Sequence, residues 1–231
     1  MRFTAICMGL CLVSSLVFGQ TGDKKLQLWA TYYYVPILPH DPEGVPLLDQ
    51  TGQPTGFNLN PFQWCQAAIE GTVIVRRDGQ DHVFNYAGRS SDLQVDCRES
   101  LRYSDYGGYE STGKVLWTET TGMGKGSRNY DLVPFRTIAV DTTLIPIGSA
   151  VYIPAARGVP FLDPDGQSRR HDGYFFAADV GGGIRGNHID VFLGTASHNP
   201  FPFIASRPEK TFEAWIVDHA EVRAQLEGLH R

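Results

Sequence analysis

The sequence predicts a mainly all-β protein with few short helices. Glycine and proline number 25 and 14 among 231 residues, aromatic residues make up 12%, and charged residues make up only 19%. This composition is typical of a turn-rich β protein and not of a helical bundle. In the second half of the chain, short aromatic and β-branched segments alternate with turns, and no amphipathic helix separates them. With 42% hydrophobic residues, the chain can bury one large domain or a barrel that carries an inserted subdomain.

The N-terminus has the pattern of a secretory signal peptide over residues 1–19. Arg2 is followed by an uncharged apolar stretch over residues 3–18, and small Gly19 stands before a cleavage point ahead of Gln20. The stretch is short for a bilayer span, so a retained membrane anchor is the less favoured interpretation. We therefore expect an exported protein, periplasmic or secreted, with no stable membrane span after cleavage.

Two of the four cysteines belong to this leader. Leu10 precedes Cys11 where a lipid-attachment signal requires a small residue, so the sequence does not predict a lipoprotein. Cys65 and Cys97 remain after cleavage and would meet an oxidising compartment. We expect them to form a structural disulfide, because neither lies in a motif that lowers the pKa of a thiol.

The first third of the chain predicts a strand, a loop and a helix. Residues 28–38, LWATYYYVPIL, are rich in aromatic and β-branched residues and predict a strand. Proline and glycine recur in residues 39–56 too often for regular structure, so this segment is predicted as a loop. A short helix is predicted over residues 61–71, with Pro61 at its start and Gly71 at its end.

Strand signals dominate the remainder. TVIVRR at 72–77 and HVFNYAG at 82–88 are separated by DGQD, which indicates a hairpin. A bridge rich in tyrosine and glycine follows. The last residues, 219–231, predict a short helix. Five further strands are predicted between the bridge and this helix, at 135–141, 149–155, 173–179, 188–194 and 212–219.

The charge pattern excludes a general nucleic-acid binder. The formal net charge is -5, and the chain contains no concentrated run of lysine and arginine. Binding to nucleic acid depends on neutralising many phosphates with such a surface.

A glycine-rich loop within residues 177–194, AADVGGGIRGNHIDVFLG, carries the densest signal in the sequence. Gly181, Gly183 and Gly186 satisfy the dinucleotide-binding pattern G-x-G-x-x-G. That site requires a helix that begins in the loop, whereas the next segment alternates apolar and polar residues like a strand. No Gly-Lys-Ser/Thr follows either, so both the dinucleotide site and the P-loop are excluded.

Three other interpretations of this region are open. An aspartic protease would need two similar loops, and only one is visible in the sequence. A metal site built from His171, Asp172, His188 and carboxylates is chemically possible, although no two of these residues have a known ligand spacing. A plain glycine hairpin whose aspartates bind turn amides is the simplest alternative.

Three aspartates argue against the plain hairpin. Asp141 and Asp179 each end a strand-like segment, and Asp190 interrupts another between two apolar residues. An acid in an apolar strand costs free energy unless it is paired, hydrogen-bonded or used. If the three strands are neighbours, the carboxylates converge, and their mutual repulsion raises the pKa of one of them. A carboxyl that stays protonated near neutral pH can act as a general acid.

Two long segments resemble a known family. TIAVDTTLIPIGSAVYIP at 137–154 and FFAADVGGGIRGNHIDVFLG at 175–194 are similar to the three-aspartate domain of membrane-bound lytic transglycosylase A and of stationary-phase survival proteins. The resemblance implies a double-psi β-barrel formed by residues 20–36 and 111–220. It also implies an inserted subdomain at 37–110, which forms the other wall of a groove for glycan.

The resemblance further implies an enzyme that cleaves the β-1,4 bond between N-acetylmuramic acid and N-acetylglucosamine in peptidoglycan glycan strands. The product is a 1,6-anhydromuramoyl sugar, and the family requires neither metal nor cofactor. By position in the motif, Asp190 is the catalytic acid and then the base. Asp179 and Asp141 are its companions, expected to orient it and to keep its pKa high.

Substrate-binding residues are also expected from the motif. Lys114 resembles a lysine before the barrel of the survival proteins, and either binds a substrate group or is simply solvated. Val180 stands where the family usually has threonine, which removes a hydroxyl from the loop. The loop residues expected to contact substrate are Gly182, Gly183, Arg185 and Asn187.

A noncatalytic alternative belongs to another class of protein. Expansin-like glycan-binding modules also use a double-psi barrel, and the fold alone does not guarantee cleavage. The three retained acids favour the enzyme, whereas Val180 and the unmatched insertion keep the binding module open. The sequence specifies no oligomeric state.

Overall fold

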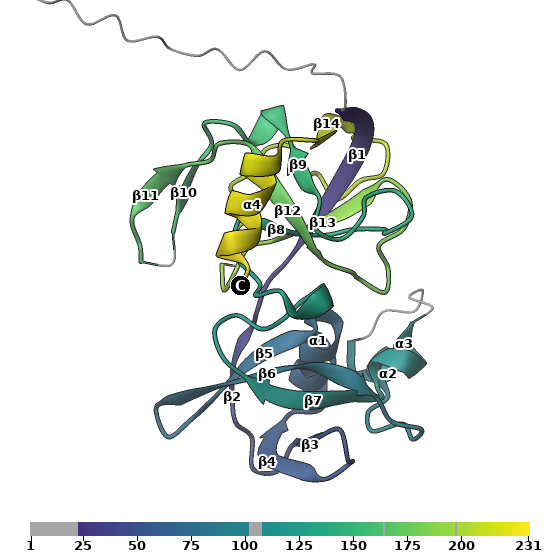
Figure 1. Ribbon diagram of the computed structural model, residues 1–231. Helices are drawn as coiled ribbons and strands as arrows, with labels where there is room; N and C mark the ends of the chain where they lie inside the picture. Colours follow the sequence, from purple (N-terminus) through teal and green to yellow (C-terminus); the bar gives the residue numbers. More distant parts are fainter. Residues whose placement is uncertain (1–22, 102–107, 164, 197) are drawn as a thin grey trace, which may run out of the picture.

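The computed structural model describes residues 23–101, 108–163, 165–196 and 198–231. The predicted signal peptide at 1–19 lies outside the described residues. The chain forms a closed barrel and a second unit that is inserted between the first and second barrel strands (Figure 1). In the described part of the chain, no helix is long and apolar enough to cross a bilayer.

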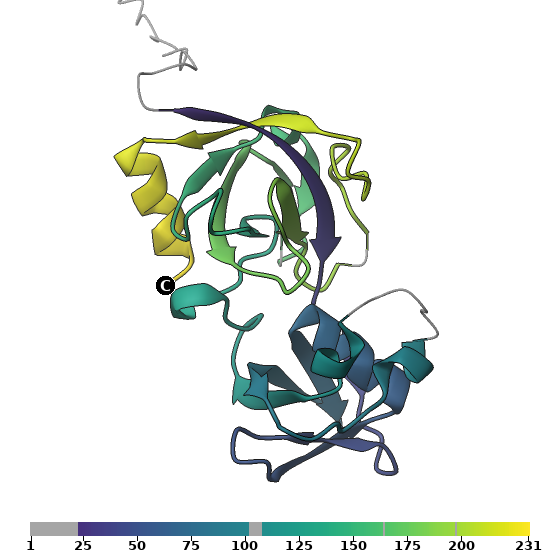
Figure 2. The same cartoon turned by 90° about the vertical axis from the view of Figure 1, so that its right-hand side faces the viewer.

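The barrel has six strands. Figure 2 looks into the barrel, with the inserted unit below it. Around the barrel the order is β1-β13-β8-β12-β9-β14, and β14 pairs with β1 to close it. The β1–β13 and β8–β12 pairs are parallel, and the other pairs are antiparallel. This mixed, closed barrel with few helices confirms the predicted fold class, a double-psi β-barrel. Its strands are β1 (Lys24–Tyr33), β8 (Thr137–Ala139), β9 (Ala150–Tyr152), β12 (Tyr174–Asp179), β13 (His188–Phe192) and β14 (Phe212–Val217).

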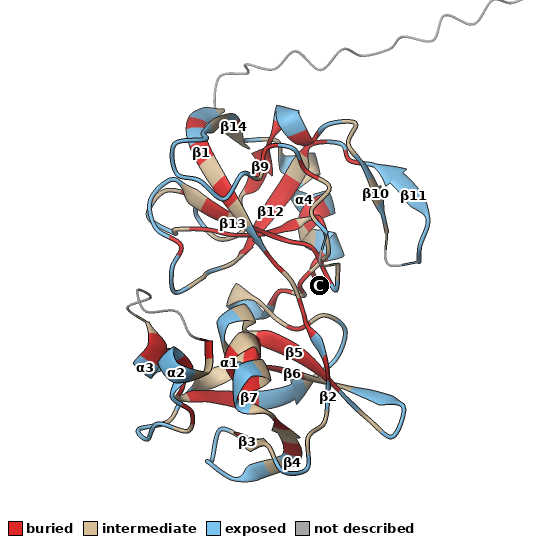
Figure 3. Ribbon diagram, turned by 180° about the vertical axis from the view of Figure 1, so that it is seen from behind, coloured by how far each residue is buried: buried red, intermediate tan, exposed pale blue. Residues whose placement is uncertain are grey.

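The side chains of β1 point alternately into the barrel and toward its outer face. Leu26, Leu28 and Ala30 are buried in the barrel core, whereas Trp29 and Thr31 are half-buried. Figure 3 shows buried and less buried positions alternating along β1. Because successive side chains of a strand face opposite sides, β1 supplies both core and surface. The core is completed by apolar residues of the other strands, among them Ile138, Val151, Phe175, Ile189 and Val191.

The inserted unit has a sheet and a core of its own. Its sheet has the order β2-β5-β6-β7, and β3 and β4 form a separate hairpin. Trp64 and Trp117 meet edge to face in its fully buried core. The strands are β2 (Ile37–Pro39), β3 (Val45–Leu48), β4 (Pro54–Leu59), β5 (Thr72–Arg77), β6 (Gln80–Arg89) and β7 (Val115–Thr120), and the helices are α1 (Pro61–Glu70), α2 (Cys97–Leu101) and α3 (Tyr109–Thr112).

The structure corrects the boundary between the two units. Residues 111–220 are predicted to belong to the barrel, but β7 pairs antiparallel with β6 of the inserted sheet. Trp117 on β7 is completely buried in the core of the insertion. The buried apolar run at the start of β7 does not reveal from sequence which of two sheets the strand joins. Its pairing with β6 shows that the inserted unit extends through Thr120.

Two element predictions also change. The strand predicted over residues 28–38 is split into β1 and β2, and Pro36 lies in the break. The loop predicted over residues 39–56 contains β3 and the start of β4, an irregular antiparallel pair that begins Val45↔Leu59. Proline is tolerated there because a two-stranded hairpin consists of edge strands.

The predicted helix at 61–71 forms as α1. The side chain of Asn60 accepts a hydrogen bond from the amide of Gln63, and Pro61 occupies the first turn. Gly71 ends the helix in the left-handed region, with φ of 80°. The last helical residue is therefore Glu70, which lines the groove described below.

The remaining elements lie against the barrel. The predicted C-terminal helix forms as α4 (Ala220–Leu229), where Glu227 accepts a hydrogen bond from the hydroxyl of Tyr130. A short hairpin of β10 (Pro160–Leu162) and β11 (Ser168–Arg170) extends from the barrel (Figure 1). Two short 3-10 turns occupy Ser127–Asn129 and Pro154–Ala156.

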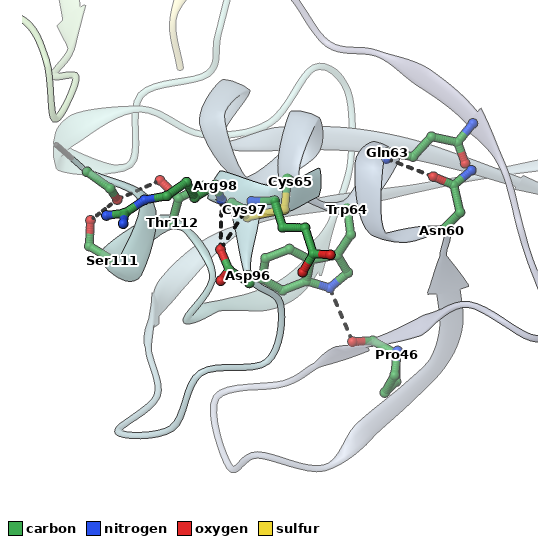
Figure 4. Close-up of a disulfide and its surroundings, with 12 residues drawn as sticks. Pro46, Asn60, Gln63, Trp64, Cys65, Asp96, Cys97, Arg98, Ser111 and Thr112 are labelled. Atoms are coloured by element: carbon green, nitrogen blue, oxygen red, sulfur yellow. Dashed lines mark hydrogen bonds between the residues drawn. A yellow bond between two sulfur atoms is a disulfide. The ribbon is translucent and has the colours of Figure 1, made fainter. Parts of the chain in front are cut away.

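A disulfide joins Cys65 of α1 to Cys97 of α2 (Figure 4). Both cysteines are completely buried in the core of the insertion. Beside them, the indole of Trp64 donates a hydrogen bond of 3.3 Å to the carbonyl of Pro46. The disulfide therefore fixes the helices of the insertion to each other and, through α1, to the β3–β4 hairpin.

We expect the double substitution Cys65→Ser and Cys97→Ser to destabilise the protein. Closing a loop of 32 residues in the unfolded chain contributes about 3–4 kcal/mol to the free energy of unfolding. Urea unfolding, followed by tryptophan fluorescence, measures this loss. Reduction of the wild type should cause a similar loss, and the double variant should not respond to the reductant. Equal stability of the oxidised wild type and the variant would contradict this role.

Candidate active site

A groove of about 940 Å³ lies between the barrel and the inserted unit. Both units line it, so neither forms the site alone. The barrel contributes Tyr33, Asp141, Asp179, Val180, Gly182, Arg185 and Asp190. The insertion contributes Ile69, Glu70, Asn85, Tyr86, Arg89 and Thr118.

Strand pairing brings the three predicted aspartates to this groove. Ala139 on β8 is the register partner of Asp190 on β13 and of Asp179 on β12. The two carboxyls therefore flank the end of β8, and Asp141 follows two residues later. All three residues line the groove.

The pKa of Asp190 is higher than that of an ordinary aspartate. Burial raises its pKa to about 6, the hydrogen bond from Thr31 partly offsets this, and the negative charge of Asp179 adds to the rise. The Thr31 hydroxyl donates to Oδ1 at 2.7 Å. Among the described residues none donates a hydrogen bond to Oδ2, so this oxygen is available to a bound molecule.

Asp179 has a different set of partners. Burial raises its pKa to about 6, although two hydrogen bonds favour its charged form. The Tyr33 hydroxyl donates to Oδ2 at 2.8 Å, and the amide of Val180 donates to Oδ1 at 2.8 Å. With both oxygens occupied, Asp179 acts on its surroundings by its charge and does not present a free oxygen.

Asp141 is an anchor for the glycine loop. Oδ2 accepts the amide of Gly186 at 2.7 Å, and Oδ1 accepts the amide and hydroxyl of Thr143. These bonds, led by that of Gly186, lower its pKa to about 2. Gly186 has φ of 59°, in the left-handed region that favours glycine. Burial, the hydrogen bond from Thr31 and the charge of Asp179 shift the pKa of Asp190.

Glu70 is a groove carboxyl that sequence reasoning missed. Oε2 accepts the amide of Tyr34, in the segment that links β1 to β2, at 3.0 Å. Burial raises the pKa of Glu70 to about 7, and the charge of Asp190 contributes to the rise. In the sequence Glu70 is an ordinary last residue of a helix, and no local pattern marks it.

Thr31 and Tyr33 were also missed, although a weak signal existed. Both lie in the aromatic segment predicted as a strand, at alternate positions on the face opposite Leu28 and Ala30. The alternation of residues along the strand indicates that Thr31 and Tyr33 share a face. Their hydrogen-bond partners, however, lie on β12 and β13.

Only some of the residues expected to bind substrate line the groove. Gly182 and Arg185 line the groove, and Val180 lines it with half of its side chain exposed. The side-chain amide of Asn187 instead donates to the carbonyl of Gln27. Gly183, Asn187 and Lys114 are not among the described residues that line the groove.

The metal interpretation gains no geometric support from the described residues, which contain no cluster of three potential ligands. His171 is a buried core residue whose two ring nitrogens are both used. Nδ1 accepts the amide of Gly173 at 2.9 Å, and Nε2 donates to the carbonyl of Phe135 at 2.7 Å. His188 does not line the groove, and its ring stacks on Trp29.

The part of the barrel that carries the aspartates matches a known family model. Residues 136–199 match the family model described as 3D domain, and they include all three aspartates. Residues 136–199, which include four of the six barrel strands in part or in full, are therefore similar to a 3D domain. Among curated proteins no match to the sequence is found.

The fold of this chain is similar to that of solved MltA structures. The crystal structure of E. coli MltA with bound chitohexaose matches with a TM-score of 0.54 and 19% identity, over 82% of this chain and 71% of that chain. The membrane-bound lytic murein transglycosylase from Agrobacterium tumefaciens matches with a TM-score of 0.54 and 14% identity, over 88% and 78%. At these identities the likeness establishes a shared fold.

The raised carboxyl pKa values predict how stability depends on pH. Folded Asp179 and Asp190 hold protons up to about pH 6, whereas unfolded aspartate loses them near its ordinary pKa of 3.8. Between these values the folded state binds more protons, so the free energy of unfolding falls as pH rises from about 4 to about 7.

The variant Asp190→Asn should reduce this fall. It removes one desolvated charge and should stabilise the protein by about 1–2 kcal/mol at about pH 8, with little effect near pH 4. Urea unfolding at the two pH values measures the difference. Asp92→Asn, at an exposed position outside the groove, is the matched control. An identical pH dependence of Asp190→Asn and wild type would contradict the burial of this charge.

Proposed function

We propose that this protein is an exported lytic transglycosylase that acts on peptidoglycan. The observation that carries the proposal is Asp190, a carboxyl with a pKa of about 6 and one free oxygen, in a groove between two units. The shared fold supports it, because E. coli MltA was solved with an oligosaccharide, chitohexaose, bound. The bond cleaved is the β-1,4 bond between N-acetylmuramic acid and N-acetylglucosamine.

In the first step Asp190 acts as the general acid. Its proton passes from Oδ2 to the glycosidic oxygen while the bond from that oxygen to C1 of the muramoyl residue breaks. The leaving sugar takes the proton as its hydroxyl, and positive charge develops at C1. Asp190 is then a carboxylate, stabilised by the hydrogen bond from Thr31.

In the second step the same carboxylate acts as the base. It removes the proton from the 6-hydroxyl of the muramoyl residue, and O6 forms a bond to C1. The product is the 1,6-anhydro sugar, and Asp190 regains its proton. No water is consumed, so a second carboxylate at the separation found in hydrolases is not required.

The companion residues have separate tasks in this scheme. The charge of Asp179 keeps Asp190 protonated until substrate binds and stabilises positive charge at C1. Asp141 holds the glycine loop through Gly186, so that Gly182 and Arg185 face the groove. Tyr86 and Arg89, whose guanidinium lies over the tyrosine ring, offer an aromatic and a cationic surface on the opposite wall.

We expect Asp190→Asn to lower the release of anhydromuropeptides at least about 100-fold, because the amide cannot transfer a proton. The measurement is mass spectrometry of products released from purified peptidoglycan, together with a pelleting assay for glycan binding. Binding should persist, since the shape of the side chain is retained. Asp165→Asn, in the β10–β11 turn, is the control with full activity.

Two outcomes would overturn this assignment. Full activity of Asp190→Asn would remove Asp190 from its role. Binding by the wild type without any anhydro product would favour the noncatalytic, expansin-like module.

The pH dependence of kcat provides a second test. The reaction begins with protonated Asp190, whose pKa is about 6, so kcat should fall roughly tenfold for each pH unit well above this value. Initial rates at saturating substrate between about pH 5 and pH 8 measure this fall of kcat. A rate that rises across this range would contradict the role of Asp190 as the initial acid.

A further inference from the structure

His188 lies behind Asp190 on the outer face of the β1–β13 pair. The parallel register places Trp29 opposite His188 and Thr31 opposite Asp190. Because residues two apart on a strand share a face, the four side chains form a row along this face. Of the four, Asp190 lines the groove, and the other three do not. The row therefore leads from the candidate acid away from the substrate.

The contacts along this row are specific. Nε2 of His188 and Oγ1 of Thr31 are 2.8 Å apart, and Oγ1 of Thr31 is 2.7 Å from Oδ1 of Asp190. The imidazole stacks on the indole of Trp29, with ring centroids 3.6 Å apart and planes at 7°. The stack fixes the plane of the imidazole and aims Nε2 at the hydroxyl.

A hydroxyl has one hydrogen, and this decides the direction of both bonds. If Thr31 donates to the Asp190 carboxylate, it must accept from His188, so Nε2 carries a hydrogen. We propose that His188 is a positioning residue for Asp190: by donating to Thr31, it directs the threonine hydrogen to Oδ1 and leaves the transferable proton on Oδ2. This inference rests on the proposed function.

The arrangement assists the step in which Asp190 loses its proton. The carboxylate that forms accepts from Thr31, and polarisation by His188 strengthens that bond. Burial lowers the pKa of His188, and a hydrogen bond with the backbone of Gly183 partly offsets this. A neutral imidazole has one hydrogen, so while Nε2 donates to Thr31 the other ring nitrogen does not donate to the backbone of Gly183.

Other charged groups around Asp190 belong to different elements. Asp179 lies at the end of β12, Glu70 at the end of α1, and Tyr33 on β1. The groove is also lined by Asp141, Arg185 and Lys125. None of them makes a hydrogen bond to Thr31 or His188 among the described residues, so variants of the row leave their contacts in place.

Four variants separate positioning from packing. His188→Phe retains an aromatic ring for the stack on Trp29 and removes Nε2. Thr31→Val retains the shape of threonine and removes the hydroxyl, whereas Thr31→Ser retains the hydroxyl. The double variant Thr31→Val with His188→Phe completes a double-mutant cycle. Thermal unfolding confirms that each variant is folded.

Loss of either group should weaken the stabilisation of the Asp190 carboxylate. We expect His188→Phe and Thr31→Val to lower kcat about 10-fold, with KM changed less than about twofold. The high-pH limb of kcat should move to higher pH, because the hydrogen bond from Thr31 lowers the pKa of Asp190. Thr31→Ser should restore kcat and the pH limb. In the Thr31→Val background, His188→Phe should have no further effect.

Nuclear magnetic resonance tests the same claim without turnover. ¹⁵N-labelled histidine should show a hydrogen on Nε2 of His188, and the ¹³C titration of the Asp190 carboxyl should shift upward in His188→Phe. A bare Nε2 across the active pH range, or additive losses in the cycle, would overturn the proposal. Absence of anhydro product from the wild type, with the expected resonances present, would instead overturn the proposed function alone.

Discussion

The parallel pairing of β1 with β13 is the contact on which the site depends. It joins two neighbouring strands of the barrel, and its register places Thr31 beside Asp190. The inward side chains of both strands bury the apolar core, so a slip of one residue would turn Asp190 into the barrel. The free energy of core burial thus holds a carboxyl where its desolvation is costly. The same pairing that stabilises the fold therefore supplies the weakly acidic group of the site.

The three aspartates of the 3D domain differ because their surroundings differ. Asp141 accepts three hydrogen bonds and is an ionised anchor. Asp179 and Asp190 are desolvated, with pKa values raised to about 6. Asp179 has both oxygens bonded to protein, whereas Asp190 keeps one free. One residue type thus performs structural, electrostatic and chemical tasks, as hydrogen bonding and burial dictate.

The insertion turns a face of the barrel into a groove. It places Glu70 and Tyr86 opposite the aspartates, and its disulfide and tryptophan pair keep that wall rigid. Glu70 also binds the amide of Tyr34 in the connection between the units, and Gln66 of the same helix donates to the Tyr34 hydroxyl. Helix α1 is thereby joined to the segment that leaves the barrel, so the two walls are linked by polar contacts at the groove itself.

The sequence by itself determined the class of fold, most strands and the identity of the three acids. These features depend on local alternation, turn residues such as Gly71, and acids set within apolar segments. The tertiary structure decided which sheet β7 joins and which acid keeps a free oxygen. It also revealed the roles of Thr31, Tyr33, Glu70 and His188 beside the acids. These residues look ordinary in the sequence because strand register and burial, which create their contacts and shift carboxyl pKa values, join segments more than 100 residues apart in the chain, as Thr31 and Asp190 are.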